Sequence, residues 1–160
     1  MEKVQTITRL GITTTVDSNG QLHSLDDKPS SIDSKGTGFW HNRGVLHREG
    51  GPAVDGRHLQ MWYRQGKIHR DGDEPAIYED NGRRVMYYKN DLPHRVFGPA
   101  VIELSGAHKL ETYYIHGQKY PDREFWERDA VLLRSKEQKK APKTTAENIL
   151  EAIEKTPKVK

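Results

Sequence analysis

Short stretches of alternating apolar and polar residues run along most of the chain, and turn sequences separate them every 10–14 residues. Alternation with a period of two is typical of β-strands, and Asn-Gly and Asp-Gly pairs are typical of hairpin turns. The pattern predicts a mainly β fold, an elongated antiparallel meander of about four to five hairpin repeats. We expect about two strands in each repeat and about one or two short helices at the C-terminal end.

One sequence unit recurs along the chain and organises it. Its clearest copies are WHNRGVLHREGGPAV at 40–54, WYRQGKIHRDGDEPAI at 62–77 and YYKNDLPHRVFGPAV at 87–101. A weaker copy lies at 16–32, and a truncated copy lies at 113–121. Four histidines mark equal positions at spacings of 24, 22 and 25 residues: His23, His47, His69 and His94.

Each unit carries two turn signals, which predict tight hairpins because Gly, Asn and Asp tolerate a positive φ. The turns inside units are Asn19-Gly20, Arg43-Gly44, Gln65-Gly66, Asn90-Asp91 and His116-Gly117. The turns that join units are Lys35-Gly36, Asp55-Gly56, Asn81-Gly82 and Ser105-Gly106.

Aromatic residues occupy two neighbouring positions of the unit, which point to opposite faces of a strand. The first position holds Trp40, Trp62, Tyr87 and Tyr113, and the second holds His41, Tyr63, Tyr88 and Tyr114. We expect one ladder to form the core and the other to be half exposed. Two aromatic faces on a thin sheet indicate a binding surface, so the candidate partner-binding residues are Tyr63, Tyr88 and Tyr114.

The shared pattern, aromatic-x-x-x-Gly-x-Leu-His-Arg-x-x-Gly-Pro-Ala, resembles variant MORN repeats of the kind common in bacteriophages and large DNA viruses. The resemblance implies a β-hairpin scaffold that makes protein or lipid contacts, and it implies no catalytic site. The first unit departs from the pattern at Ser24, where Arg is expected, and at Ser30-Ser31 after Pro29. It is interpreted as a degenerate cap.

Two helices are expected after the last repeat. Asp122 is a candidate N-cap for the first helix, and Phe125, Val131 and Leu132 are expected to face inward. A capping-box pattern at Thr144 then precedes a second, short helix that needs a docking surface, whether the sheet, a second copy of the chain or a partner. Its apolar stripe is Ile149, Leu150 and Ile153, and the neighbouring bases are Lys136, Lys139, Lys140 and Lys143.

These signals divide the chain into five parts. They are an N-terminal segment at 1–11, a β-hairpin repeat domain at 12–121, a capping helix at 122–134, a basic linker at 135–143, and a C-terminal helix and tail at 144–160.

Charge and composition indicate where the basic residues lie and which cellular compartment suits the chain. The net charge is +3, with +1 on residues 38–126 and +3 on residues 127–160, so the excess base lies in the C-terminal part. The chain has no cysteine, which excludes disulfides and thiolate chemistry and favours a reducing cytoplasm. No apolar run approaches the roughly 20 residues of a membrane-spanning helix.

The histidines do not form a metal site in this arrangement. Equal positions in adjacent units lie two strands apart, about 10 Å, whereas zinc ligands lie about 2 Å from the ion. We expect each repeat histidine to hydrogen-bond neighbouring backbone. The acids are scattered singly and no nucleotide or nucleophile motif is present, so neither catalysis nor a cofactor is expected.

Arg48, Arg70 and Arg95 each follow a repeat histidine and form a row at a spacing of about 10 Å. Such a row can bind acidic side chains or phosphates bidentately. The alternative is that each arginine pairs with a local acid such as Glu49 or Asp71.

The favoured function is a non-enzymatic protein-binding scaffold. From the resemblance, we expect a virus-encoded factor that docks on a host enzyme in the cytoplasm and inhibits or redirects it, with a homodimer through the C-terminal helix as a further option. The main alternative is a nucleic-acid-binding accessory protein that uses the arginine row and the basic tail. The third and fourth alternatives are binding to acidic membrane surfaces and a structural role in a virion.

Overall fold

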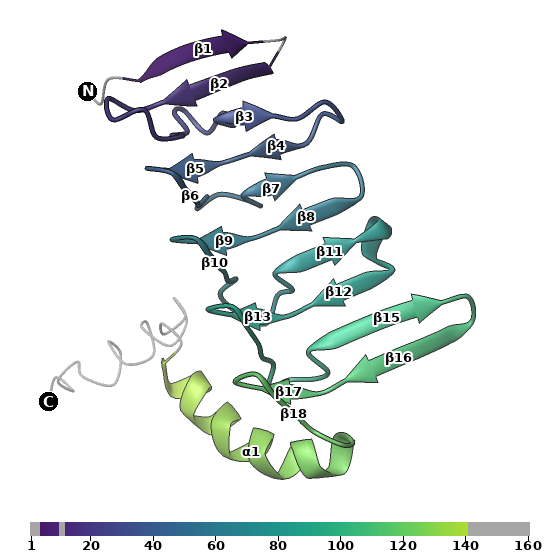
Figure 1. Ribbon diagram of the computed structural model, residues 1–160. Coiled ribbons are helices and arrows are strands. Elements are labelled where there is room, and N and C mark those ends of the chain that lie inside the picture. The colour runs from purple at the N-terminus through teal and green to yellow at the C-terminus, as the bar shows by residue number, and fades with distance from the viewer. Residues whose placement is uncertain (1–3, 10–11, 141–160) are drawn as a thin grey trace, which may run out of the picture.

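A computed structural model describes residues 4–9 and 12–140 of the protein. The expected antiparallel meander is confirmed, because ten strands form one sheet in which each neighbouring pair is antiparallel (Figure 1). In sheet order the strands are β1 (Gln5–Arg9), β2 (Ile12–Val16), β3 (Ser31–Ile32), β4 (Gly38–Phe39), β7 (Val54–Asp55), β8 (Leu59–Met61), β11 (Ile77–Glu79), β12 (Arg84–Met86), β15 (Val101–Ser105) and β16 (His108–Thr112). A short 3-10 turn, η1 (Asp80–Gly82), joins β11 to β12.

Four small hairpins lie outside this sheet, so a full unit contains four strands and not the two expected. The hairpins are β5 (His41–Asn42) with β6 (Val45–Leu46), β9 (Tyr63–Arg64) with β10 (Lys67–Ile68), β13 (Tyr88–Lys89) with β14 (Leu92–Pro93), and β17 (Tyr114–Ile115) with β18 (Gln118–Lys119). Figure 1 shows them stacked along one side of the molecule, which we call the hairpin edge. The first unit has only a single bridge in this place, between Val16 and Leu22.

A single aromatic residue connects the sheet to each hairpin. Trp62 lies between β8 and β9. Its backbone N–H donates to the carbonyl of Ala76 at 2.8 Å, and its backbone carbonyl accepts the backbone N–H of His69 at 3.1 Å. Trp40 and Tyr87 repeat this arrangement. The alanine of each Pro-Ala pair (Ala53, Ala76 and Ala100) is fully buried, because the chain passes closely beside its neighbour there.

The sheet begins earlier than the sequence indicated. Residues 1–11 were expected to precede the repeats, but β1 pairs with β2 over five residue pairs, from Gln5 with Val16 to Arg9 with Ile12. The threonine-rich segments of both strands favour extended backbone. The N-terminal segment therefore adds an edge strand to the first unit.

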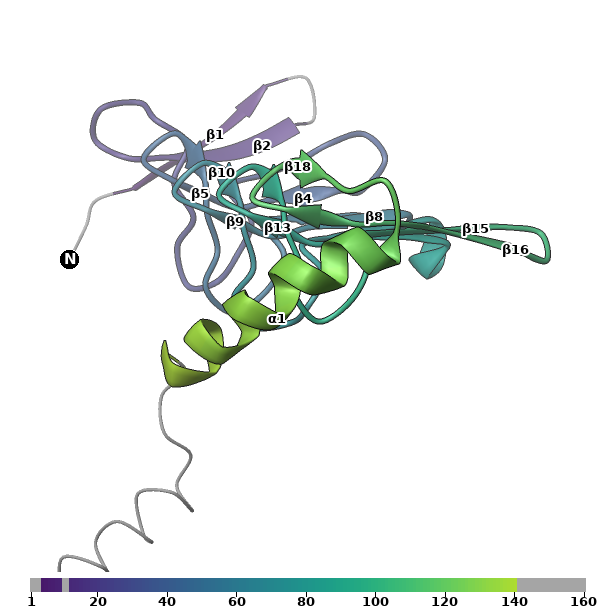
Figure 2. The same ribbon diagram turned by 90° about the horizontal axis from the view of Figure 1, so that it is seen from below.

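Up to residue 140, the C-terminal part forms one helix, α1 (Arg123–Lys140), so this helix continues through most of the expected linker. The second expected helix lies outside the described residues. Asp122 caps it as expected, since its Oδ1 accepts the N–H of Phe125 at 3.0 Å. Seen from below, α1 lies against the last hairpin (Figure 2).

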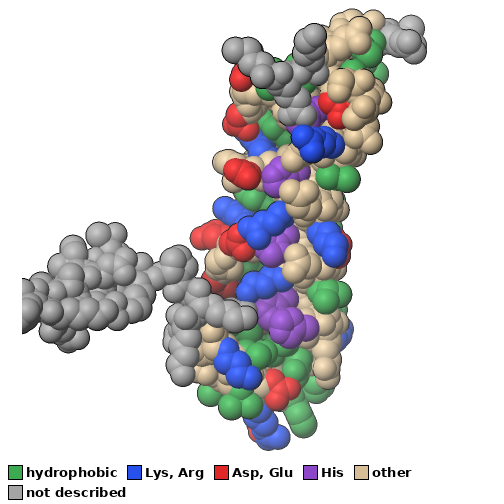
Figure 3. Space-filling view, turned by 90° about the vertical axis from the view of Figure 1, so that its left-hand side faces the viewer, with side chains coloured by type: hydrophobic (Ala, Val, Ile, Leu, Met, Phe, Trp, Pro, Cys, Tyr) green, Lys and Arg blue, Asp and Glu red, His purple; other side chains and the backbone are tan. Residues whose placement is uncertain are grey.

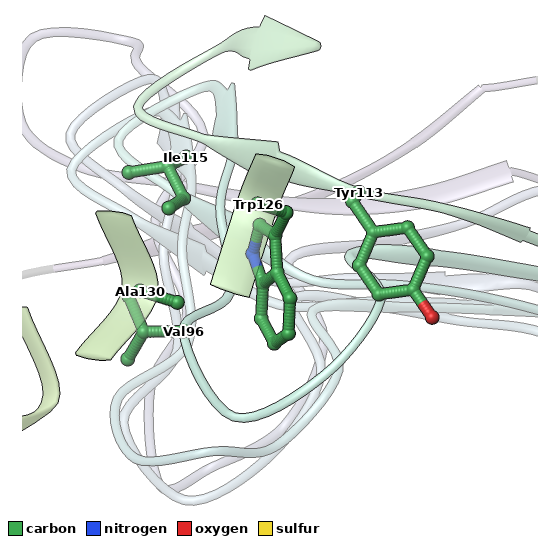
Figure 4. Packing of buried hydrophobic residues seen from close by; sticks show 5 residues of the cluster. All are labelled: Val96, Tyr113, Ile115, Trp126 and Ala130. Carbon is green, nitrogen blue, oxygen red and sulfur yellow. The ribbon is translucent and has the colours of Figure 1, made fainter. Parts of the chain in front are cut away.

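The buried face of α1 differs from the prediction. Phe125, Val131 and Leu132 are each more than half exposed. Instead Trp126 and Ala130 are buried, where they pack with Val96, Tyr113 and Ile115 (Figure 4). The indole Nε1 of Trp126 also donates to the carbonyl of Arg95 at 3.1 Å, which satisfies its polar atom.

Candidate functional site

The hairpin edge is built from tight two-residue turns. Both central residues of each turn have positive φ, as in type I′ hairpins: Arg43-Gly44, Gln65-Gly66, Asn90-Asp91 and His116-Gly117. Three of these pairs place glycine second, where positive φ carries no steric penalty. Four of the five expected internal turns are therefore of this type, and each points its backbone toward the preceding unit, whereas at Asn19-Gly20 only the glycine has positive φ.

Backbone hydrogen bonds connect one hairpin to the next. The second turn residue of each hairpin donates its N–H to a carbonyl of the preceding unit at 2.8–2.9 Å: Gly44 to Leu22, Gly66 to Leu46, Asp91 to Ile68 and Gly117 to Pro93. The hairpins thus form a continuous, hydrogen-bonded edge and not a set of independent loops.

The repeat histidines provide a second connection between units. Their Nδ1 atoms accept the N–H of the first turn residue in the following hairpin: His23 from Arg43 at 3.3 Å, His47 from Gln65 at 3.2 Å, His69 from Asn90 at 3.3 Å and His94 from His116 at 3.1 Å. The expected hydrogen bond to neighbouring backbone is therefore present in all four units. An Nδ1 acceptor requires the neutral ring with its proton on Nε2.

His69 makes contacts through both of its ring nitrogens. Its Nε2 lies 3.0 Å from Oδ1 of Asp71, and Asp71 also forms an ion pair with Arg64. Burial lowers the pKa of His69 below its ordinary value of 6.5, and the positive charge of Arg64 adds to this shift. The Nδ1 of His69 also lies 3.0 Å from Oδ1 of Asn90, and a hydrogen bond with this oxygen raises the pKa, but burial is the larger effect and the net shift is downward.

Tyr120 takes the histidine position in the last unit, which has no following hairpin. Its backbone N–H still donates to the carbonyl of Tyr113 at 3.0 Å. Its hydroxyl donates to Oδ2 of Asp129 on α1 at 2.5 Å, and this hydrogen bond raises the pKa of Tyr120 to about 12. The substitution redirects the inter-unit contact to the helix.

The arginines that follow the histidines stack on the aromatic residue of their own unit. The guanidinium carbon lies 3.9 Å from the ring centroid for Arg48 on Trp40, 4.0 Å for Arg70 on Trp62 and 3.8 Å for Arg95 on Tyr87. Each Nη1 also donates to the carbonyl of the unit's own proline, at 3.0–3.4 Å. These contacts fix both the arginine and the ring.

For Arg48 and Arg95, the paired carboxylates are not local acids of the kind considered from the sequence, whereas Arg70 approaches the local Glu74 at 3.9 Å. Arg48 binds Asp27 bidentately, and Arg95 binds Asp73 in the same way. Each aspartate belongs to the unit before its arginine. Glu49 instead approaches His47 at 3.9 Å, and Asp71 contacts His69 and Arg64.

The two aromatic ladders are buried to different degrees. Trp40 and Tyr113 are buried, whereas Trp62 and Tyr87 are half-buried. The second ladder (Tyr63, Tyr88 and Tyr114) is half-buried throughout, and its backbone carbonyls accept the N–H groups of Arg48, Arg70 and Arg95. Tyr63, Tyr88 and Tyr114 begin strands of the hairpin edge, so their partner-binding role stays a prediction located on that edge.

Figure 3 shows the hairpin edge as one surface, with histidines in a column, basic side chains between them and acidic side chains mostly along one flank. Open grooves separate successive hairpins. One groove is lined by Asp27, Asn42, Arg43, His47 and Arg48, and the next by Arg48, Tyr63, Gln65, His69 and Arg70. The edge thus repeats the same chemistry at regular intervals.

Other predicted site residues lie where the structure gives no side-chain contacts. Lys139 and Lys140 fall in the last turn of α1, and their side chains are outside the described part. The apolar stripe of the second helix (Ile149, Leu150 and Ile153) and Lys143 lie outside the described residues altogether.

Comparison of the chain with protein-family models, curated proteins and solved structures finds no match. Within residues 4–9 and 12–140, no three His, Cys, Asp or Glu side chains lie close enough together to hold a metal ion. The one α-helix of that part is too polar to cross a membrane.

Proposed function

We propose that this protein is a non-enzymatic protein-binding repeat scaffold and that the hairpin edge is its binding face. The observation that carries the proposal is the periodic edge itself, with open grooves at which histidine and arginine recur and at which the second-ladder position is His41 in one groove and the half-buried Tyr63 in the next. A rigid, repeating surface presents several equivalent contacts to one partner at little entropic cost.

Exposed apolar residues on the same edge support a protein partner. Val45 on β6 and Leu92 on β14 occupy equal positions in their hairpins and are 42% and 46% exposed. An apolar contact flanked by polar groups is characteristic of protein interfaces. The arginine row favours protein over nucleic acid, because the guanidinium groups of Arg48 and Arg95 already hold carboxylates.

The repeat histidines argue for binding over catalysis. A general base needs a free lone pair near substrate, but Nδ1 of each repeat histidine accepts a backbone N–H. The resemblance to viral MORN-type repeat proteins extends the proposal to a virus-encoded factor that inhibits or redirects a host enzyme.

The test is capture of the partner by the full chain from native cells, identification by mass spectrometry, and affinity measurement with purified partner. Leu92→Glu places a charge on the hairpin edge, and we expect it to weaken binding at least about tenfold, a loss of about 1.4 kcal/mol. The matched control is Leu110→Glu on β16, where the leucine is 59% exposed but belongs to the large sheet.

Equal affinities for the parent chain and Leu92→Glu, with a loss in Leu110→Glu, would place the binding face elsewhere. If the captured protein is an enzyme, its turnover with and without the full chain shows whether binding inhibits or redirects it. A steep salt dependence of binding to DNA or RNA, with no protein captured, would favour the nucleic-acid alternative.

A further inference from the structure

The loop between the repeat histidine and the proline alternates in length from unit to unit. Five residues separate His23 from Pro29 and also His69 from Pro75. Four residues separate His47 from Pro52 and also His94 from Pro99. Units with a long loop therefore alternate with units that have a short loop.

The long loops carry the carboxylates that hold the arginine row. Asp27 and Asp73 each stand two residues before the proline of a long loop. Asp27 accepts hydrogen bonds from Nε and Nη2 of Arg48 at 2.7 and 2.8 Å, and Asp73 accepts both from Arg95 at 2.7 Å. Each long loop thus binds the arginine of the next unit through the same edge of the guanidinium group.

The unit before Arg70 has a short loop. Among the described residues, no carboxylate binds the Nε and Nη2 edge of the Arg70 guanidinium group as Asp27 and Asp73 bind those of Arg48 and Arg95. The position two residues before Pro52 is Gly50, around which an added Cβ would meet nothing within 4 Å. Arg70 stacks on Trp62 and donates Nη1 to the carbonyl of Pro75, as its counterparts do. Among the described residues, no hydrogen bond reaches its Nε or Nη2, and Glu74 approaches only Nη1, at 3.9 Å.

The Arg70 side chain is more accessible than its counterparts. The side chain of Arg70 is 26% exposed, whereas those of Arg48 and Arg95 are each 16% exposed. Arg70 lines the open groove that also contains Tyr63 and His69. Stacking and the proline hydrogen bond hold the guanidinium plane in place, so little side-chain entropy remains to be lost when an acid binds.

The other short loop, between His94 and Pro99, differs because α1 covers it. Arg134 donates Nε to the carbonyl of Val96 at 2.5 Å, and its guanidinium carbon lies 5.1 Å from the centroid of the Trp126 ring. The helix therefore occupies the space beside the short loop of the fourth unit. Among the described residues, none occupies the corresponding space beside the short loop of the second unit, which lies between His47 and Pro52 and precedes Arg70.

We propose that Arg70 binds an aspartate or glutamate side chain of the partner protein, in the bidentate geometry that Asp27 and Asp73 provide within the chain. The inference rests on the proposed protein-binding function and names the chemistry of one contact. Glu49 and Asp71 line the groove together with Arg48 and Arg64, and Glu74 approaches Arg70 at 3.9 Å. A carboxylate is favoured over a nucleic-acid phosphate because these nearby acids disfavour an extended polyanion more than a single acid.

The experiment uses the full chain and a peptide that copies the chain's own long loop, the acetylated and amidated pentapeptide Gly-Asp-Glu-Pro-Ala. Nitrogen-15 NMR of the arginine Nε–H groups reports the contact directly. We expect the Arg70 Nε–H resonance to shift saturably below about 10 mM peptide, while those of Arg48 and Arg95 stay in place. A peptide with Asn for Asp and Gln for Glu should give no shift at Arg70.

Two variants complete the test. Arg70→Lys keeps the charge but loses the bidentate fork, so it should weaken binding of the acidic peptide at least about tenfold. Arg57→Gln removes a base from the exposed turn between β7 and β8 and should bind the peptide like the parent chain. Urea unfolding midpoints establish that both variants are folded.

The proposal is overturned if the Arg70 resonance does not respond to the acidic peptide, or if it responds to a ten-nucleotide oligothymidylate and not to the peptide. It is also overturned if Arg70→Lys binds the purified partner with parental affinity while Leu92→Glu does not, a result that leaves the protein-binding function standing. If Leu92→Glu binds the purified partner with parental affinity while Arg70→Lys binds it more weakly, the result contradicts the proposed binding face and leaves the Arg70 contact intact.

Discussion

Each repeat histidine joins two units through one ring nitrogen. The acceptor role of Nδ1 recurs in four units although the donors differ in side chain: Arg43, Gln65, Asn90 and His116. Only the donor's backbone conformation is shared, since all four have φ near +50°. The histidine therefore recognises a turn geometry and not a residue type, which explains its regular spacing in a sequence whose turns vary.

Protonation of His69 is expected to destabilise the fold. Burial lowers its folded-state pKa below 6.5, so the neutral ring contributes stability that is fully present above pH 6.5 and is lost as the pH falls below that value. His69→Gln keeps a hydrogen-bond acceptor but cannot titrate. We expect it to reduce the slope of unfolding free energy against pH between about 5 and 7, measured by urea unfolding.

The control for His69 is His108→Gln, at an exposed position on β16. It should keep the parental slope. An unchanged slope in His69→Gln would show that protonation of this ring does not destabilise the folded state.

The arginine contacts show which part of the edge the sequence could not predict. The row itself follows from the spacing of Arg48, Arg70 and Arg95. The carboxylates that bind Arg48 and Arg95, however, lie 21 and 22 residues earlier in the chain. Proximity in sequence favoured Glu49 and Asp71. The alternation in loop length was the available signal, because it placed an aspartate before the proline only in the long loops.

Two pairs of neighbouring units, the first with the second and the third with the fourth, are held together by arginine–aspartate pairs as well as by the sheet. Asp73→Asn removes the charge that binds Arg95 and keeps the side-chain shape. We expect a loss of about 0.5–1 kcal/mol in unfolding free energy, since the pair is bidentate but the Asp73 side chain is 35% exposed. A double-mutant cycle with Arg95→Gln isolates the pair. A coupling energy near zero would mean that ring stacking alone positions Arg95.

The helix illustrates how two apolar stripes compete on one element. Phe125, Val131 and Leu132 suit a helical face, but so do Trp126, Ala130 and Leu133, and sequence periodicity alone does not choose between them. The second set is buried because the Trp126 ring packs on Tyr113 at 4.9 Å and its Nε1 reaches the Arg95 carbonyl. These contacts depend on the position of the last hairpin.

Trp126 is therefore expected to contribute most of the docking energy of α1. With only 2% of its surface exposed, Trp126→Ala should cost about 3–5 kcal/mol in urea unfolding. Phe125→Ala, at a 51% exposed position next to it, should cost no more than about 0.5 kcal/mol. Similar costs for the two variants would contradict the observed orientation of the helix.

At the scale of the whole molecule, the meander could be predicted but its division into a sheet and a hairpin edge could not. Repeat spacing and turn chemistry define the order and direction of the strands. The hairpin edge depends on the aromatic residue at each junction with the sheet, such as Trp62. The backbone N–H of Trp62 donates to the sheet, while its backbone carbonyl accepts a hydrogen bond from the hairpin. That change of partner is a tertiary feature with no separate sequence signal.

At the C-terminal end of the strand stack, the large sheet and the hairpin edge are closed in different ways. The last strand of the large sheet, β16, carries charged residues, and Lys109 pairs with Glu111 there at 2.5 Å. Charges on an edge strand disfavour pairing with another chain. The last hairpin is covered instead by α1, which buries Val96 and Ile115.

Removal of α1 should therefore cause self-association. A chain that ends at Pro121 exposes Val96, Tyr113 and Ile115 beside an uncovered hairpin, and we expect sedimentation velocity to show species larger than the full chain, increasingly with concentration. A chain that ends at Lys140 keeps the helix and should remain free of this association. If the full chain alone is dimeric, residues 141–160 carry the expected homodimer contact. If the chain ending at Pro121 sediments as a monomer at every concentration, the apolar surface under α1 is not the surface that the helix protects.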